Sequence, residues 1–192
     1  MTVKLNTNDY EREFNNAIER TDSWGMCAPY FRTHPRRVTE ENDNEISQYI
    51  QSALGRFSAE QISQQCIAVA FFMKEELESL LNTSLTYTLG YVELNQRNVF
   101  YTPEAELKAM LSSPLTQGAV NLHAWLTTPS YEIIDPTFWT TYGVVNNDPG
   151  CIGSVMMQHY SLFNQHLIHH PQIVGEEYLY GIGGIIELVD KR

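Results

Sequence analysis

The apolar periodicity of this chain changes once, near Leu85, and no other feature of the sequence constrains the fold as strongly. Upstream of this point, apolar residues recur every three or four positions, which is the spacing of one face of a helix. Downstream, short β-branched or alternating segments are separated by polar turns, as expected for strands. Because the helices precede most of the strands, the sequence predicts an α+β fold in which N-terminal helices pack on an antiparallel β-sheet.

The pattern also predicts where these elements begin and end. Helices are predicted over residues 8–20, 39–54, 58–81, 103–112 and 154–169. Strands are predicted over residues 85–94, 99–102, 120–128, 131–138, 178–180 and 185–189. The stretch 21–38 contains Pro and Gly and is predicted to be a long surface loop. Ser58 and Gln61 fit a capping box at the start of the helix 58–81.

The length and composition indicate one folding unit. The 192 residues fall within the usual size of a single domain, and an apolar fraction of 43% is sufficient for a core. We divide this domain into an N-terminal helical segment (1–57), a central segment with the candidate catalytic residues (58–140), and a C-terminal helix with strands (141–192).

The charge balance argues against two classes of partner. Twelve Lys and Arg residues face 23 Asp and Glu residues, which gives a net charge of −11 at pH 7. Nucleic acid and anionic membrane surfaces both attract basic proteins, so neither partner is expected. The longest apolar run, Cys66 to Met73, is far too short to cross a bilayer.

The first residues lack the apolar segment of a secretory signal peptide. We therefore expect a soluble protein that is synthesised in the cytoplasm. Action outside the producing cell would require a secretion system that does not depend on a cleaved signal.

The chain has three cysteines, Cys27, Cys66 and Cys151. An odd number in a chain of this size is typical of reduced thiols rather than of a disulfide framework.

A nucleophilic thiol needs a base to take its proton and a third group to orient that base. Cys66 lies near the start of an apolar helix, and the positive potential of a helix N-terminus favours a thiolate. His123 lies in one predicted strand and Asp135 ends the next. A hairpin of these strands would place both side chains on one face of the sheet.

This region contains four short motifs: Cys66-Ile-Ala-Val-Ala70, Gly90-Tyr91, His123-Ala124-Trp125 and Asp135-Pro136-Thr137. Together they resemble the core of the transglutaminase-like, or papain-like, cysteine enzymes. The motifs follow the order of the family over residues 60–140. The resemblance implies a papain-like core with Cys66 as nucleophile, His123 as base and Asp135 as the residue that orients His123. We expect no cofactor and no metal ion.

The expected activity is that of a thiol hydrolase or acyltransferase that acts on an amide bond. The resemblance allows a peptidase, an amidase, a glutamine deamidase or a transglutaminase, and hydrolysis is favoured because the sequence indicates no amine-acceptor pocket. The substrate would be a peptide, a protein or a peptidoglycan peptide. A small acidic chain without a signal peptide also fits a bacterial effector toxin. The alternative is a non-catalytic protein-binding module that keeps the fold with an idle triad.

Two further roles have several candidates. The Cys66 backbone N–H would stabilise an oxyanion together with a second donor, for which the candidates are Gln65, Gln64 and Trp24. Cys27 competes with Cys66 as nucleophile, although its Pro- and Gly-containing surroundings predict no helix after it.

The start of the helix that carries Cys66 is also open. In one interpretation Ser63 is the N-cap and residues 58–62 form a separate turn, whereas in the other Cys66 lies inside a longer helix.

His166 and His170 have the i, i+4 spacing of a helical metal site. No Cys or carboxylate accompanies them at ligand spacing, so we interpret them as a solvated helix end.

Overall fold

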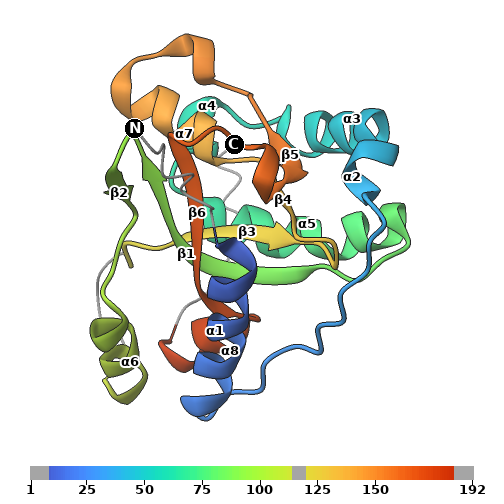
Figure 1. The fold of residues 1–192 in the computed structure, drawn as a ribbon. Coiled ribbons are helices and arrows are strands. Elements are labelled where there is room, and N and C mark those ends of the chain that lie inside the picture. The colour runs from blue at the N-terminus through green and yellow to red at the C-terminus, as the bar shows by residue number, and fades with distance from the viewer. Residues whose placement is uncertain (1–8, 114–119, 184–192) are drawn as a thin grey trace, which may run out of the picture.

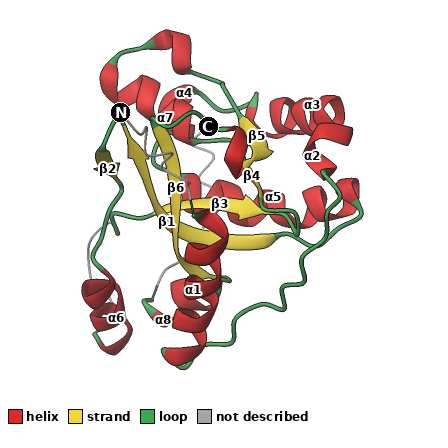
Figure 2. Ribbon diagram, in the orientation of Figure 1, coloured by secondary structure: helices red, strands yellow, loops and turns green. Residues whose placement is uncertain are grey.

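A computed structural model describes residues 9–113 and 120–183, and these residues form an α+β fold as predicted (Figures 1 and 2). The helices in the described residues are α1 (Tyr10–Ser23), α2 (Val38–Glu41), α3 (Asp43–Leu54), α4 (Ala59–Ile62), α5 (Cys66–Leu81), α6 (Glu104–Ser112), α7 (Phe138–Asn146) and α8 (Glu177–Gly181), with 3-10 helices η1 (Pro149–Cys151) and η2 (Tyr160–Leu162). The strands are β1 (Thr86–Leu94), β2 (Arg97–Val99), β3 (His123–Thr127), β4 (Glu132–Asp135), β5 (Met156–His159) and β6 (Leu167–Val174).

The six strands form one antiparallel sheet with β1 at its centre. The order is β2-β1-β3-β4-β5, in which β2 and β3 share one edge of β1, and β6 pairs with its other edge. In Figure 1, α1 lies in front of the sheet and α5 lies behind it. The sheet therefore has a helix on each face, and both faces are buried.

The alternation of side chains along β3 sorts residues between two cores. Ala124 and Leu126 face the larger core, which contains α3, α5 and α8. Trp125 faces the smaller core under α1, where it packs with Tyr10 and Phe14. Successive residues of a strand point to opposite faces, so His123 shares the α1 face with Trp125.

Several predicted elements are confirmed. The first helix buries Tyr10, Phe14 and Ala17, as the helical spacing predicted. The predicted hairpin is present, but its second strand, β2, is Arg97–Val99 instead of 99–102. The turn consists of Asn95 and Gln96 alone, which both have positive φ, as a two-residue type I′ turn requires.

The prediction for the C-terminal third is wrong in three places. Residues 154–169 contain β5, η2 and the start of β6 instead of a helix, and residues 178–180 belong to α8 instead of a strand. A helix, α7, begins at Phe138, where the sequence analysis placed the end of a strand. Pro171 is compatible with β6 because, among the described strands, β6 pairs with β1 alone, so Pro171 lies in an edge strand of the described sheet. The predicted strand 185–189 lies outside the described residues.

The long segment between α1 and α2 has no helix or strand, as predicted, and the buried carboxylate of Glu132 holds its far end. Glu132 accepts hydrogen bonds from the backbone N–H groups of Val38 (2.9 Å) and Thr39 (3.0 Å) and from the Ser130 hydroxyl (2.6 Å). The carboxylate thereby joins α2 to β4.

We expect Glu132→Ala to lower the free energy of unfolding by about 3–5 kcal/mol, because several buried donors would lose a charged acceptor. Urea unfolding followed by circular dichroism measures this change. Glu41→Ala, which removes only an exposed ion pair with Arg36, is the control and should unfold like the wild type. Equal stability of the two variants would contradict the role of Glu132.

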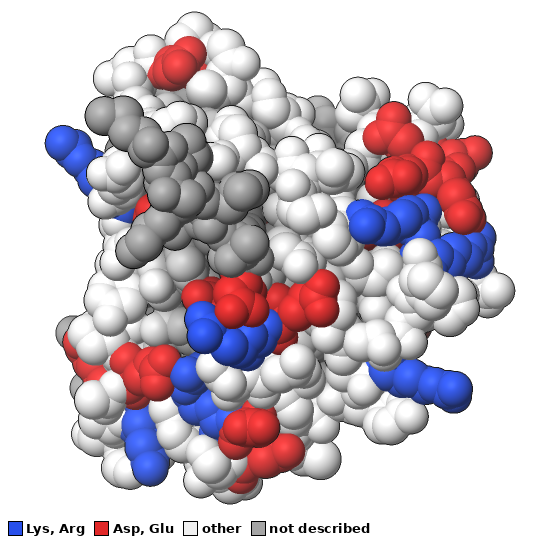
Figure 3. Space-filling view, viewed as in Figure 1, with Lys and Arg blue, Asp and Glu red and all other residues white. Residues whose placement is uncertain are grey.

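On the face in Figure 3, most basic side chains lie in groups with acidic ones. Ion pairs join Arg20 to Glu104 and Arg36 to Glu41. Among the described helices, none has both the length and the apolar character needed to span a bilayer.

Candidate functional site

Cys66 is the first residue of α5. The capping box of Ser58 and Gln61 is present as predicted, but the helix it starts ends at Ile62. Gln64 then takes a left-handed conformation (φ 65°), which interrupts the helical path before α5 begins. Residues 58–62 are therefore a separate turn, and Cys66 does not lie inside a longer helix. The N-cap of α5 is Gln65, not Ser63.

This position gives the Cys66 thiol the environment of a helix N-terminus. The N–H groups of the first turn have no acceptor one turn earlier in the same helix, so they carry a positive potential. The residue is 6% exposed. Its sulfur lies 3.7 Å from the Leu122 carbonyl oxygen, just before β3.

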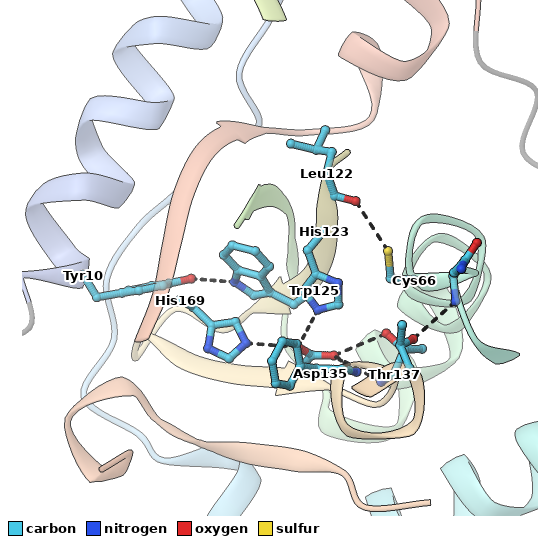
Figure 4. Close-up of polar contacts among 11 residues, drawn as sticks. Tyr10, Cys66, Leu122, His123, Trp125, Asp135, Thr137 and His169 are labelled. Carbon is cyan, nitrogen blue, oxygen red and sulfur yellow. Dashed lines mark hydrogen bonds and ion pairs between the residues drawn. The ribbon is translucent and has the colours of Figure 1, made fainter. Parts of the chain in front are cut away.

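The structure brings His123 and Asp135 into direct contact (Figure 4). His123 Nε2 lies 2.7 Å from Asp135 Oδ2, and both side chains are fully buried. They come from neighbouring antiparallel strands, β3 and β4, and point to the same face of the sheet. The strand–turn–strand arrangement expected from the sequence accounts for this contact.

The other oxygen of Asp135 is held by the start of α7. Oδ1 accepts hydrogen bonds from the backbone N–H groups of Thr137 and Phe138, both at 3.1 Å. Burial alone would raise the pKa of Asp135, but His123 and His169 outweigh this effect and hold the pKa well below its usual range. Asp135 is therefore a carboxylate, and the Asp-Pro-Thr sequence turns the chain so that α7 begins against it.

His123 lies between the Asp135 carboxylate and the Cys66 thiol (Figure 4). Burial would lower the pKa of His123, but Asp135 and then Cys66 raise it to about 10. Its Nδ1 atom has no hydrogen-bond partner among the described residues. The imidazole is therefore anchored on one side and available to a neighbouring group on the other.

A second imidazole, His169 of β6, contacts the same carboxylate, and the sequence analysis missed it. His169 Nε2 lies 3.0 Å from Asp135 Oδ2, and the side chain is fully buried. Burial, the largest cause, lowers the pKa of His169. The alternation of Leu167 and His169 is a strand signal that could have revealed this inward position, but the spacing of the nearby histidines was interpreted as helical.

Aromatic rings cover the His123 imidazole. Phe100 stacks on it with the ring centroids 5.2 Å apart, and Phe138 meets it edge to face at 5.7 Å. Phe100 is partly exposed and has a φ of 63°, which is unusual for a bulky residue. Its ring therefore lies between the imidazole and solvent.

The three candidates for the second oxyanion donor lie in different settings. Gln65 is partly buried directly before Cys66, and the exposed Gln64 donates its backbone N–H to Thr141 (3.3 Å). Trp24 packs against the larger core, and its ring lies 6.5 Å from that of Tyr178 in α8.

The other cysteines and the expected histidine pair lie in different surroundings. Cys27 is exposed in the segment after α1, with no helix beginning there, and Cys151 lies in η1. Partial burial and the Asp148 carboxylate raise the pKa of Cys151. His166 and His170 do not lie at a helix end: His166 precedes β6, and His170 lies within this strand and contacts Glu13 at 2.8 Å.

His123, Asp135 and His169 are also the one group in the described residues whose ligand atoms are close enough to share a metal ion, all within 4.8 Å. Imidazole and carboxylate are ligands that suit first-row metals. The two imidazoles, however, already contact one carboxylate oxygen at hydrogen-bond distances, in a site with no exposed surface.

In this arrangement the edge of the His123 imidazole opposite Asp135 faces the Cys66 thiol at the N-terminus of α5. Comparison with known proteins adds no relationship: the chain matches no protein-family model, no curated protein and no solved structure.

Proposed function

We propose that this protein is a thiol hydrolase that cleaves an amide bond through Cys66, His123 and Asp135. One observation carries the proposal: His123 is bound to Asp135 through Nε2, while its Nδ1 edge, which has no partner within residues 9–113 and 120–183, faces the Cys66 thiol at the start of α5. A thiol, a base and an oriented carboxylate in this order are the components of nucleophilic catalysis by cysteine.

In the proposed reaction, His123 Nδ1 takes the proton of Cys66, and the thiolate sulfur attacks the amide carbonyl carbon. As the carbon–nitrogen bond breaks, His123 returns the proton to the leaving amine, and the acyl group stays on sulfur. Water then gives a proton to His123 while its oxygen attacks the thioester. The acid product leaves, and the thiol regains the proton.

The negative oxygen formed during attack needs hydrogen-bond donors. The backbone N–H of Cys66 belongs to the first turn of α5 and is unused by the helix, so it is the first donor in this proposal. Gln65 is the favoured second donor because it directly precedes Cys66 and is partly buried.

A papain-like or transglutaminase-like core remains part of the proposal, on the four sequence motifs together with a helix–sheet arrangement that suits them. We propose a peptide, a protein or a peptidoglycan peptide as substrate, water as the acceptor, and neither nucleic acid nor a membrane as partner. Delivery as an effector toxin by a signal-independent secretion system is consistent with this substrate class.

The test measures the alkylation of each cysteine by iodoacetamide between pH 5.5 and 9, with the modified residue located by mass spectrometry. Cys66 is expected to react below pH 7 despite its burial, because His123 can hold the thiol proton. His123→Ala should lower this rate by about 100-fold, on the scale of general-base catalysis.

Cys27 and Cys151 provide internal controls in the same digest. Their rates should follow those of ordinary thiols and should not change in His123→Ala. If Cys66 is alkylated only above pH 8, at a rate independent of His123, the triad is idle and the protein is a binding module. Selective alkylation would justify a screen of amide substrates, with Cys66→Ala as the inactive reference.

A further inference from the structure

We propose that His169 is a positioning residue of the thiol site: it fixes the Asp135 carboxylate so that His123 presents Nδ1 to Cys66. This inference rests on the proposed function and deepens it. It assigns a role to a side chain that lies 34 residues beyond Asp135 in the sequence and that comes from a different strand, β6.

The hydrogen bonds around Asp135 define this role. Oδ2 is shared by His123 Nε2 (2.7 Å) and His169 Nε2 (3.0 Å). Oδ1 accepts hydrogen bonds from the backbone N–H groups of Thr137 and Phe138 and from the Thr137 hydroxyl. An ionised carboxylate has acceptor sites only, so all of these partners must be donors. Both imidazoles therefore carry a proton on Nε2.

The proton on Nε2 determines what the opposite edge of each ring can do. With Nε2–H donated to Asp135, the proton that His123 gains or loses is the one on Nδ1, the edge that faces Cys66. A carboxylate held by His123 and α7 alone could rotate its Oδ2 away from the ring. The hydrogen bond from His169 prevents this rotation, because Oδ2 then lies between two fixed donors.

Packing alone does not explain a histidine at position 169. The ring lies among apolar and aromatic groups, with the Trp125 ring 5.0 Å away edge to face and Phe163 at 5.5 Å. Its Nδ1 has no partner among the described residues, and a buried polar atom without a partner is unfavourable. An apolar side chain would avoid this cost, so the contact with Asp135 is the feature that a histidine provides here.

The test compares His169→Phe, which keeps an aromatic ring without the N–H donor, with His169→Gln, whose amide can donate from a similar position. His169→Phe is expected to lower the alkylation rate of Cys66 at pH 7 about tenfold, by analogy with the lower end of the losses seen when partners that orient metal-ligating histidines are removed. His169→Gln should stay within about threefold of the wild type. Thermal unfolding checks that both variants are folded at the assay temperature.

Proton NMR provides a readout that a purely structural role would not change. The His123 Nε2–H proton in its short bond to Asp135 should give a downfield resonance, and this resonance should be assigned by its loss in His123→Ala. We expect it to broaden or disappear in folded His169→Phe and to persist in His169→Gln.

The outcomes separate this inference from the proposed function. If wild-type Cys66 is unreactive below pH 7, the proposed function fails. If Cys66 is reactive and depends on His123, but folded His169→Phe keeps the wild-type rate and resonance, only the role of His169 is overturned. If Zn²⁺ added to the wild type shifts the ring signals of both His123 and His169, the two are shared metal ligands, and the positioning role is likewise overturned.

Discussion

Asp135→Asn is expected to lower the alkylation rate of Cys66 at pH 6.5 by about 100-fold or more, even though the new side chain has almost the same shape. We base the size of this rate loss on catalytic triads in which the carboxylate was replaced by an amide. In those triads the amide gives the histidine the wrong tautomer. Asn serves as the third residue in some cysteine enzymes, so the expected loss depends on the particular hydrogen bonds of this site.

All partners of Asp135 donate: the two imidazoles to Oδ2, and two backbone N–H groups and the Thr137 hydroxyl to Oδ1. An Asn side chain has one oxygen and one NH₂ group, so one set of donors would meet another donor. If NH₂ faces the imidazoles, His123 must accept on Nε2 and carry its proton on Nδ1, where it can no longer take the thiol proton. If NH₂ faces α7, two buried N–H groups lose their acceptor, at a cost of about 1–3 kcal/mol each.

The stability difference between wild type and Asp135→Asn should depend on pH. The pKa of His123 is raised to about 10 from about 6.5 in the unfolded chain. Its contribution to stability is therefore complete below about pH 6.5 and is lost as the pH rises through 10. The pKa of Asp135 is lowered, so its contribution is present above its unfolded value of about 3.9 and is lost as the pH falls below that value. The difference should be largest between about pH 4 and 6.5.

Urea unfolding at pH 5.5, 8 and 10, together with alkylation of the same samples, measures both effects. Thr137→Ser, which keeps the backbone N–H bound to Oδ1, is a control that should retain the alkylation rate of the wild type. A folded Asp135→Asn variant with the wild-type rate would show that the carboxylate does not set the proton position on His123.

The second large effect is expected for Gly90→Ala, which should abolish stable folding at 37 °C. Gly90 lies in β1 opposite His123, where β1 also pairs with β6. A Cβ atom at this position would overlap the backbone carbonyl oxygen of His170 and lie 2.9 Å from the Trp125 ring. The central strand would have to separate from β6, because a backbone carbonyl cannot turn aside as a side chain can. We expect a loss of at least about 3 kcal/mol, a large part of the 5–15 kcal/mol that stabilises a typical domain.

Gly150→Ala is the matched control. Its added Cβ meets only a flexible Asp148 side-chain oxygen, at 3.3 Å, in the exposed η1 turn. Circular dichroism and thermal unfolding of the two variants measure the difference. If Gly90→Ala unfolds within 2 °C of Gly150→Ala, β1 and β6 are not in close contact at this point.

The local sequence was sufficient where an element depends on its own residues. The apolar stripe of Tyr10, Phe14 and Ala17 predicts α1, and the Ser58 and Gln61 capping box marks the start of α4. The pairing of His123 with Asp135 was also predictable, because a short hairpin connects the two strands that carry them and the side-chain period of a strand is two residues.

The same local rules failed where a distant part of the chain decides the conformation. Residues 167–174 form a strand because β1 offers a free edge for pairing, and the helical spacing of their histidines could not reveal this edge. The start of α5 depends on the left-handed Gln64, whose backbone N–H is held by Thr141 of α7. The sequence alone therefore left open whether Cys66 begins a helix.

The sequence by itself thus determined the α+β class, the first hairpin and the contact of His123 with Asp135, because these follow from periodicity and from short connections between neighbouring strands. Tertiary structure alone decided that Cys66 begins its helix, that Glu132 holds α2, and that His169 shares a carboxylate oxygen with His123. Each of these features joins segments far apart in the sequence. Such contacts depend on how the sheet and the helices pack. The local pattern of residues in the sequence does not predict that packing.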